Sequence, residues 1–232
     1  MNRRASPGFG TTPEHRADTL LVATYNIHKG VRGLGPARRL EIHNLGLGIK
    51  TLGADLVFLQ EVRLRHTREA RYFDQTWLGW PEGGQADFLA PDGYGVAYRT
   101  NAVTRHGEHG NALLSRWPIG DVGHQDVSDH RFEQRGLLHV PVRWNGSTVH
   151  AIVVHFGLAH RSRLRQVQRL AEFLAAEVPP GDRVIVAGDF NDWSERLDGP
   201  MHALGLHRAN APAGRPSPRL PFPSRPPVSA LD

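Results

Sequence analysis

The order of apolar segments predicts a mixed α/β sandwich, with two sheets packed together and helices on the outside. Three observations lead to this fold class. Two buried strands flank an amphipathic helix near the start of the chain, a block of strand-like segments fills residues 86–155, and a second amphipathic helix precedes another buried strand. Helix and strand units on both sides of a strand block need two sheets to bury their apolar faces.

The first elements follow from local patterns. Residues 20–27 are a short apolar and β-branched run that ends in the loop Lys29-Gly30, and residues 56–59 are a second run of this kind. Such runs are typical of buried strands. Between them, residues 37–52 repeat apolar side chains at helical spacing, which predicts a helix with one apolar stripe.

The later elements include five strand-like segments separated by Gly, Pro and Asn turns. They are residues 86–89, 94–99, 112–115, 136–142 and 148–155. Residues 164–178 carry a second helical stripe, which Pro179-Pro180-Gly181 stops. Residues 184–187 are apolar throughout, which predicts a strand covered on both faces. Residues 211–227 are dense in Pro, Arg and Ser, and their composition alone indicates a disordered tail.

Length and hydropathy predict a single domain. The 232 residues are 39% hydrophobic, which is enough for one sizeable core. We therefore expect one domain over residues 19–232, after a flexible polar extension at residues 1–18. No apolar run approaches the roughly 20 residues that cross a bilayer, and no apolar secretory segment opens the chain. These absences predict no integral membrane segment and a cytoplasmic location.

Residue usage restricts the chemistry. The chain has no cysteine, which excludes disulfides, thiolate zinc sites and cysteine nucleophiles, so any metal must use oxygen or imidazole ligands. The net charge of +5 and the pI near 10.2 suit a polyanionic partner such as nucleic acid or an anionic lipid surface. Lys29 and Lys50 are the only lysines, so codon bias is an alternative source of the arginines. No protein partner is indicated.

Four apolar runs each deliver a polar group at their end. These groups are Asn26, Glu61, His155 and the pair of Asp189 and Asn191. Because a strand alternates faces, Asp189 and Asn191 point the same way if the strand continues through both. Mg²⁺ prefers oxygen ligands, so Glu61 and Asn26 fit a metal site. Phosphate hydrolysis also needs a base and a group that stabilises charge, for which Asp189 and His155 are the candidates.

Each motif also has a structural alternative. Asp or Asn after a strand often caps a helix or closes a turn, although four such positions together favour a site. His106, Glu108 and His109 invite a zinc site, but their spacing departs from helical zinc motifs and favours a Gly-rich turn. Two arginine clusters, at residues 63–71 and 161–169, either follow a nucleic-acid backbone or form solvated faces.

Six motifs resemble, in their order along the chain, those of the endonuclease/exonuclease/phosphatase superfamily. They lie at residues 24–28 (TYNIH), 59–62 (LQEV), 110–119 (GNALLSRWPI), 133–136 (EQRG), 154–158 (VHFGL) and 188–191 (GDFN). The chain resembles the small bacterial members that have no settled substrate. The resemblance covers about residues 19–232. It implies a four-layer, DNase I-like α/β sandwich of two mixed sheets and divalent-metal hydrolysis of a phosphate ester.

The resemblance also implies roles for the residues that match. Asn26 and Glu61 resemble the family's metal-binding Asn and Glu, so Mg²⁺, or alternatively Mn²⁺, is the expected cofactor. His155 resembles the histidine that interacts with the scissile phosphate in the DNase I and sphingomyelinase branches. Asp189 resembles the carboxylate that orients or deprotonates the attacking water, and Asn191 resembles its companion on the phosphate.

Two further positions are assigned to the substrate phosphate. Arg135 lies in a family pattern and either contacts phosphate bidentately or forms an ion pair with Glu133. His28 stands where abasic-site endonucleases carry a second acidic residue, which implies a less acidic metal site here. The spacing of Arg165 and Gln168 also recurs in related enzymes, where it lies on a helix.

The end of the sequence departs from the family pattern. The family normally ends with a Ser-Asp-His motif, whereas this sequence stops at Asp232, so we expect the last strand or strands and that motif to be missing. Asp232 matches the Asp that orients the missing histidine, and it counts as a catalytic candidate. Ser128-Asp129-His130 has the right letters at the wrong position, and we interpret it as a decoy. The resemblance also makes residues 211–227 an ordered loop, against their composition.

The resulting hypothesis is a magnesium-dependent phosphodiesterase or endonuclease that acts on nucleic acid, DNA or RNA. The first alternatives are a sphingomyelinase-like lipid phosphodiesterase and a phosphatase of small phosphate esters, which share the same core motifs. The alternative of another class is a catalytically dead binding module, which the absent terminal motif suggests.

Overall fold

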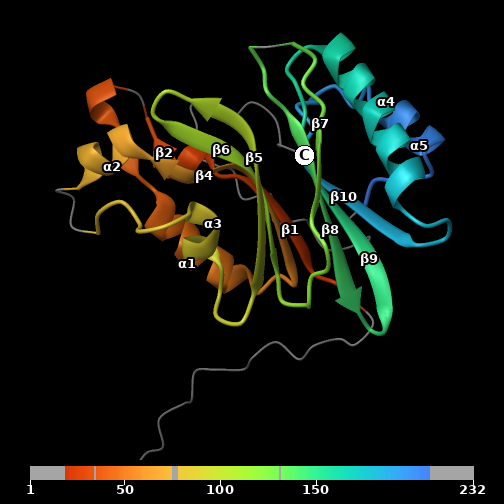
Figure 1. Cartoon of the computed structure of the whole chain (residues 1–232), viewed down its shortest axis with the longest axis horizontal. Coiled ribbons are helices and arrows are strands. Elements are labelled where there is room, and N and C mark those ends of the chain that lie inside the picture. Colours follow the sequence, from red (N-terminus) through yellow and green to blue (C-terminus); the bar gives the residue numbers. More distant parts are fainter. Residues whose placement is uncertain (1–18, 34, 75–77, 131, 210–232) are drawn as a thin grey trace, which may run out of the picture.

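Two four-stranded sheets pack face to face, and helices cover their outer faces (Figure 1). The computed structural model describes residues 19–33, 35–74, 78–130 and 132–209. The arrangement has four layers, from helices through two sheets to helices. The predicted four-layer α/β sandwich is therefore confirmed.

The first sheet has the strand order β1-β4-β6-β5. Its strands are β1 (Val22–Asn26), β4 (Leu56–His66), β5 (Gly95–Thr104) and β6 (Gly107–Ser115). β1 runs parallel to β4, whereas the β4–β6 and β5–β6 pairs are antiparallel. The outer helices are α1 (Ile42–Leu52) and α3 (Gln85–Leu89).

The second sheet has the order β10-β9-β8-β7. Its strands are β7 (Gly123–Asp126), β8 (Gly136–Trp144), β9 (Ser147–His155) and β10 (Arg183–Asp189). β9 and β10 are parallel, and the remaining pairs are antiparallel. Helices α4 (His160–Glu177) and α5 (Asp198–Ala203) lie on its outer side (Figure 1).

Short elements connect the first sheet to its helices. They are the 3₁₀ turns η1 (His28–Gly30) and η2 (Gly35–Ala37), the small sheet of β2 (Val31–Arg32) and β3 (Arg39–Leu40), and helix α2 (Thr67–Phe73). Helix α2 begins directly after β4, so the end of β4 and α2 form one continuous path.

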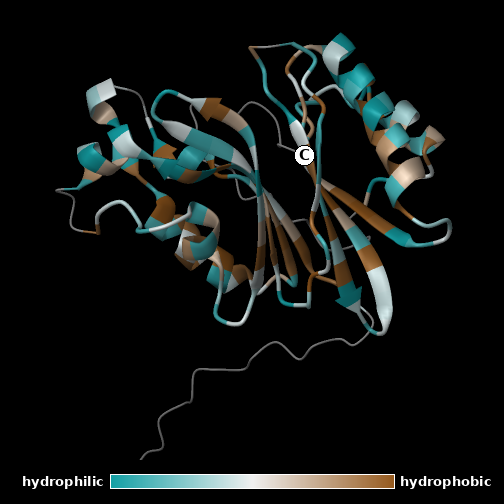
Figure 2. Ribbon diagram, viewed as in Figure 1, coloured by the Kyte–Doolittle hydropathy of each residue, from teal (hydrophilic) through white to brown (hydrophobic). Residues whose placement is uncertain are grey.

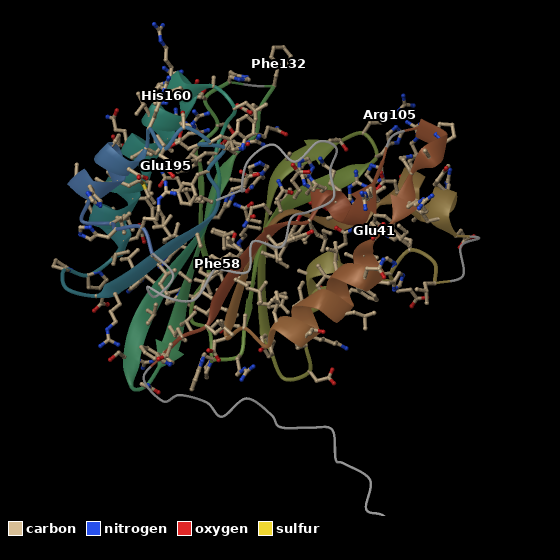
Figure 3. All side chains as sticks on the ribbon, turned by 180° about the vertical axis from the view of Figure 1, so that it is seen from behind. Glu41, Phe58, Arg105, Phe132, His160 and Glu195 are labelled. Atoms are coloured by element: carbon tan, nitrogen blue, oxygen red, sulfur yellow. The ribbon has the colours of Figure 1, made fainter. Side chains whose placement is uncertain are left out.

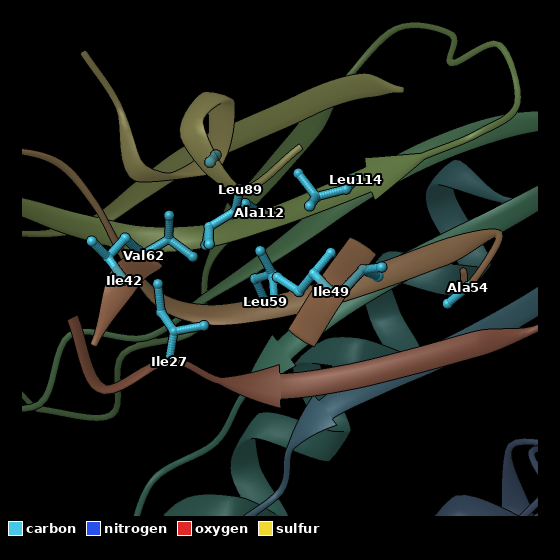
Figure 4. Close-up of a cluster of buried hydrophobic side chains, with 11 residues drawn as sticks. Ile27, Ile42, Ile49, Ala54, Leu59, Val62, Leu89, Ala112 and Leu114 are labelled. Carbon is cyan, nitrogen blue, oxygen red and sulfur yellow. The ribbon is translucent and has the colours of Figure 1, made fainter. Parts of the chain in front are cut away.

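Three apolar layers hold the sandwich together, and β4 contributes to two of them. Leu56 and Phe58 point into the layer between the sheets, whereas Val57 and Leu59 pack under α1 and α3. Figure 4 shows this second layer, in which Ile42 and Ile49 lie over β4. The third layer joins the second sheet to α4 and α5. Because both faces of β4 are covered, its apolar residues are continuous rather than alternating (Figure 2).

Two predicted elements differ from the structure. Residues 86–89 belong to helix α3, and the prediction of a strand was wrong there. A short apolar run does not distinguish the two, and the buried Ala86 and Leu89 have the three-residue spacing of one helical face. Helix α1 begins at Ile42 rather than at residue 37, because Gly35–Ala37 form a 3₁₀ turn and Arg39–Leu40 pair with β2.

The predicted strand at residues 184–187 is part of β10, but it is only half-buried. Its side chains alternate between two apolar layers, so both faces are packed as predicted. Side-chain exposure remains because β10 lies at the edge of its sheet among the described residues.

Several expectations concern the ends of the chain. Residues 1–18 and 211–227, for which a flexible extension and a tail or ordered loop were predicted, lie outside the described residues, and so does Asp232. Within the described ranges, no helix combines the length and apolar character needed to cross a membrane.

Candidate active site

The carboxyl ends of three strands from both sheets meet beside a residue in the middle of a fourth. Asn26 ends β1, His155 ends β9 and Asp189 ends β10. Glu61 lies within β4, which continues to His66 instead of ending at Glu61 as the sequence predicted. The Asn26 Nδ2 atom lies 3.0 Å from Asp189 Oδ2 and 3.4 Å from Glu61 Oε1. The His155 Nε2 atom lies 3.7 Å from Asp189 Oδ2. The structure thus brings together four of the residues that the sequence singled out.

A β-bulge aims Glu61 at this cluster. The pairing of β4 with β6 shifts register between Leu59 and Val62, and both of these side chains enter the same apolar layer. In a regular strand, positions 59 and 62 would face opposite sides. The extra residue of the bulge lies between these two positions, where Glu61 has a φ of 56°. Bulges of this kind re-aim side chains beside active sites, and a positive φ at a residue other than glycine is a local strain.

Lys29 lies against Glu61. Its Nζ atom is 2.7 Å from Glu61 Oε2, and it is carried by a turn in which His28 and Lys29 have φ values of 46° and 63°. Burial raises the pKa of Glu61. The charge of Lys29 and its hydrogen bond, together with His155 and Asn26, lower the pKa by a larger amount, so that it falls to about 2. Glu61 is therefore ionised at neutral pH.

Gln85 supports both Lys29 and the bulge, and sequence reasoning missed it. Its side chain is 1% exposed, its Nε2 atom donates to the Lys29 carbonyl at 2.8 Å, and its Oε1 atom accepts from the Arg63 amide at 2.9 Å. Gln85 begins the helix that the sequence predicted as a strand. No motif singles it out, because its role depends on a turn, η1, and a strand, β4, that lie far from it in the sequence.

The GDFN motif forms a tight turn at the end of β10. Gly188 has a φ of 151°, and any side chain there would strike the Val154 carbonyl on β9. The Asn191 amide donates to Asp189 Oδ1 at 3.0 Å, and Asn191 Nδ2 donates to the Phe156 carbonyl at 2.9 Å. The strand does not continue through both polar residues as sequence alternation assumed, because β10 ends at Asp189 and Asn191 has a φ of 50°.

His155 is buried and uncharged at neutral pH. Its side chain is 8% exposed. Burial lowers its pKa and the charge of Arg135 adds to this effect; Asp189 and Glu61 oppose it, and the pKa falls to about 4. A neutral imidazole retains one N–H donor and one acceptor nitrogen.

Arg135 forms the structural contact that was one of its two predicted roles. Its Nη2 atom lies 3.1 Å from Glu133 Oε1, and its Nε atom donates to the Phe156 carbonyl at 3.2 Å. These contacts fix the guanidinium within electrostatic range of His155. His28 has an exposed side chain, and its backbone amide donates to Asn26 Oδ1 at 3.0 Å. A phosphate contact by Arg135 or His28 stays a prediction.

A pocket of about 540 Å³ opens beside Arg135. His109 of β6 and Leu158 after β9 line it, together with Phe132, which projects from the surface in Figure 3. Burial lowers the pKa of His109 to about 4, and Lys29, Arg63 and Arg135 contribute while Glu61 opposes them. His109 therefore lies within electrostatic range of Lys29 and Glu61 and also lines the pocket, whose walls are polar and apolar.

The decoy motif and the α4 arginines have structural roles. Asp129 accepts hydrogen bonds from Ser162 and Arg165. Arg163 lies 3.5 Å from the buried Asp192, and Arg169 donates to the Ser128 carbonyl at 2.7 Å. Arg163, Arg165 and Arg169 of the second arginine cluster therefore bind partners within the fold.

The donor set around Glu61 suits a hard divalent cation. Across the described ranges, no group of three or more His, Asp or Glu side chains forms a metal cluster, which leaves the zinc alternative at His106, Glu108 and His109 without support. The Glu61 carboxylate already binds one positive group, the Lys29 ammonium. Asn26 contacts both carboxylates, Glu61 and Asp189. Ligation by Asn26 requires its Oδ1 atom to leave the His28 amide and turn toward Glu61. A site of one carboxylate and one amide oxygen is sufficient for Mg²⁺, which keeps several waters.

Comparisons with known proteins bear on the family and the fold of the chain. A model described as the Endonuclease/Exonuclease/phosphatase family matches residues 23–232. YbhP, an uncharacterized protein of Escherichia coli (strain K12), is 38% identical over 216 residues, which make up 91% of this chain and 82% of that protein.

Two solved structures share the fold. An endonuclease/exonuclease/phosphatase family protein from Leptotrichia buccalis C-1013-b aligns with a TM-score of 0.58 and 14% identity, over 79% of this chain and 72% of that one. Sphingomyelinase C from Streptomyces griseocarneus aligns with a TM-score of 0.55 and 25% identity, over 80% of this chain and 69% of that one.

Proposed function

The chain belongs to the endonuclease/exonuclease/phosphatase family, and from this premise we propose that it is a magnesium-dependent phosphodiesterase that acts on nucleic acid. The family is one of phosphoesterases. The observation that carries the proposal is the contact of Asn26 with both Glu61 and Asp189, because it supports a pair of metal ligands, Asn26 and Glu61, beside a general base, Asp189.

We assign the metal to Glu61 and Asn26. When bound there, Mg²⁺, or Mn²⁺ in its place, supplies positive charge that polarises a phosphoryl oxygen. Glu61 suits this role because it is ionised and faces the site from its bulge. The Lys29 ammonium neutralises the Glu61 carboxylate in the structure, and a metal bound to Glu61 would have to compete with it.

We assign Asp189 as the group that orients the attacking water and accepts its proton. Asn26 Nδ2 and the Asn191 amide each hold one of its carboxylate oxygens. These two bonds fix the plane of the carboxylate, and positioning of this kind is a major source of rate acceleration. A general base also needs to lie within hydrogen-bond reach of the proton that it accepts.

We assign His155, Asn191, Arg135 and His28 to the phosphate. The neutral His155 donates one N–H bond to a phosphoryl oxygen, at a position that its contact with Asp189 fixes. Glu133 and the Phe156 carbonyl hold the Arg135 guanidinium, and its remaining N–H groups would contact the phosphate. Asp232, the fourth catalytic candidate, lies outside the described residues.

The charge of the chain supports nucleic acid as the substrate. A net charge of +5 and a pI near 10.2 attract a polymer that carries one phosphate at every nucleotide. A second candidate is a lipid phosphodiester, because the chain is 25% identical to a sphingomyelinase C over 80% of its length.

The test measures hydrolysis of three substrates with Mg²⁺ or with EDTA. They are plasmid DNA, an oligonucleotide with one abasic site, and sphingomyelin vesicles. We expect Mg²⁺-dependent cleavage of a DNA substrate. Cleavage of sphingomyelin alone would replace nucleic acid by lipid, and cleavage that persists in EDTA would overturn the metal assignment. DNA that is bound without cleavage would instead support a binding module.

A further inference from the structure

A second basic pocket lies away from the candidate active site. It has a volume of about 490 Å³ and is formed where β4 passes into α2, against the turn between β5 and β6. Its lining consists of Arg38, Thr67, Arg68, Arg71, Tyr72 and His106. The Thr67 amide donates to the His106 carbonyl at 2.9 Å, which ties α2 to the turn. The pocket is therefore built by three segments that are separate in the sequence.

One wall of the pocket is held in place. The Arg38 guanidinium lies over the Tyr72 ring, 4.4 Å from its centroid, and its Nε atom donates to the Gly35 carbonyl at 3.1 Å. The Tyr72 hydroxyl donates to the Pro36 carbonyl at 3.3 Å. A guanidinium fixed on an aromatic ring retains donors for an anion and loses little conformational entropy when it binds.

The positive charge of the pocket is poorly balanced. Glu69, on helix α2, is buried and pairs with Arg63 and Arg38. Arg68 and Arg71 are exposed and have no acidic partner among the described residues. Burial lowers the pKa of the neighbouring His66 to about 4, and the charges of Arg63, His106, Arg38 and Arg68 contribute to this shift.

Further arginines extend the positive surface. Arg65 is largely exposed, with its Nε atom 3.6 Å from Glu108, and Arg105 is exposed at the turn between β5 and β6. Figure 3 shows Arg105 on the same side as the helices of the first sheet, opposite His160 and Glu195. The arginines of α4 differ from those of the pocket, because Arg163, Arg165 and Arg169 bind partners within the fold.

We propose that this pocket binds the phosphate backbone of nucleic acid at a second site, several nucleotides from the phosphate that is cleaved. Glu61 and Thr67 are joined by the end of β4, and six residues of a regular strand rise roughly 20 Å at about 3.3 Å per residue. The register shifts of β4 shorten this path, so the two sites lie within that distance along the strand. Along one strand of a DNA duplex the rise is about 3.4 Å per nucleotide, so up to about six nucleotides span the two sites. Guanidinium groups match phosphate geometry, and Arg38 is already held on the Tyr72 ring.

The shape of α2 favours nucleic acid over a lipid surface. A helix that lies on a membrane presents an apolar face to it. The apolar Phe73 is buried, whereas Arg68, Arg71 and Tyr72 are exposed. This inference rests on the proposed function only for its choice of nucleic acid, because binding can be measured in the absence of hydrolysis.

The experiment compares two double variants that lose the same charge. Arg68→Gln with Arg71→Gln changes the pocket. Arg143→Gln with Arg183→Gln changes two exposed positions of the second sheet, in β8 and at the start of β10. Binding of a fluorescent 20-base-pair DNA duplex is followed by anisotropy in EDTA, over a series of NaCl concentrations. Melting temperatures and circular dichroism establish that both variants fold.

We expect the pocket variant to bind at least about 10-fold more weakly at 100 mM NaCl, and the control variant to bind nearly as the wild type. The slope of log K against log [NaCl] should fall by about 1.8, which is two phosphate contacts on duplex DNA. In the wild type, affinity should also rise steeply once the duplex exceeds about six base pairs, and in the pocket variant it should not.

Equal affinities of the two variants would overturn the second site. If the pocket variant instead loses binding to phosphatidylserine vesicles and keeps DNA binding, the ligand is a lipid surface and the proposal is wrong. The proposed function fails separately: a wild type that binds DNA through the pocket but cleaves no substrate retains the second site and loses the enzymatic assignment.

Discussion

Asn26 and Asp189 are 163 residues apart in the chain, and yet the Asn26 Nδ2 atom lies 3.0 Å from Asp189 Oδ2. Asn26 ends a strand of the first sheet and Asp189 ends a strand of the second. The contact therefore forms only when the two sheets pack through the apolar layer that contains Phe58. Hydrolysis at this site should depend on that packing as much as on the polar residues themselves.

Replacement of Asp189 by Asn should abolish hydrolysis and leave the fold intact. The change keeps the size of the side chain but removes the group that would accept a proton, and general bases contribute about 10²- to 10⁴-fold to a rate. We expect kcat to fall by at least about 100-fold, with a melting temperature close to that of the wild type. Steady-state cleavage of DNA in Mg²⁺ and a thermal melt measure the two quantities.

Asp182→Asn is the matched control for that change. Asp182 lies before β10, at the opposite end from Asp189, where its Oδ2 atom accepts from His150 at 3.0 Å. This variant should retain kcat. Full activity of Asp189→Asn would remove Asp189 from the mechanism.

Replacement of Glu61 by Gln should raise the Mg²⁺ concentration needed for activity. The amide has the size of the carboxylate but lacks the negative charge that attracts both a divalent cation and the Lys29 ammonium. We expect the concentration for half-maximal activity to rise at least about 10-fold, with part of the activity restored at high Mg²⁺. A titration of hydrolysis against Mg²⁺ measures this, and an unchanged half-maximal concentration would contradict the assignment of Glu61 as a ligand.

Much of the fold could be predicted from sequence because strands buried on both faces leave a clear pattern. The runs at residues 56–59 and 151–154 are continuous and apolar, and both lie between two layers of the sandwich. The failures concern short segments. Residues 86–89 are too few to show a helical or a strand period, and only packing under β4 makes them helical.

The site was predictable where a polar residue ends a strand and unpredictable where a loop builds it. Asn26, His155 and Asp189 follow apolar runs and were identified for that reason. Lys29 and Gln85 were not, because a bulge and a turn with positive φ decide their contacts. Such backbone features depend on long-range pairing and have no local signature.

Replacement of Gln85 by Leu should weaken both stability and Mg²⁺ use. Leucine fills the space but leaves the Lys29 carbonyl and the Arg63 amide without their partner. Buried groups that lose a hydrogen bond cost about 1–3 kcal/mol, so the free energy of unfolding should fall by an amount of that order. Because the bulge that carries Glu61 loosens, the half-maximal Mg²⁺ concentration should rise in the fraction that remains folded.

Gln168→Leu provides the control, since the Gln168 side chain is exposed on α4 and contacts Glu172. It should change neither quantity. Urea unfolding and the Mg²⁺ titration together distinguish a positioning role of Gln85 from a purely structural one: lower stability with an unchanged Mg²⁺ requirement would exclude the positioning role.

The buried pair of His139 and His150 should make the fold sensitive to acid. The His139 Nε2 atom lies 2.8 Å from His150 Nδ1, and His150 Nε2 lies 3.0 Å from Asp182 Oδ2. Burial, reinforced by the charge of His150, lowers the pKa of His139 from 6.5 to about 4. Between these two values the unfolded chain binds a proton at this position and the folded chain does not.

The sign of the effect follows from that difference in bound protons. Since the unfolded state gains protons first as the pH falls, the free energy of unfolding should be constant in this respect above pH 6.5 and should decrease from pH 6.5 to about 4. His139→Gln keeps a donor toward His150 but removes the titration, so it should flatten the decrease, by up to about 3 kcal/mol at pH 4. Urea unfolding at half-unit pH steps measures the slope, with His202→Gln as a control at an exposed histidine. A slope identical to that of the wild type would mean that His139 accepts a proton in the folded protein without cost.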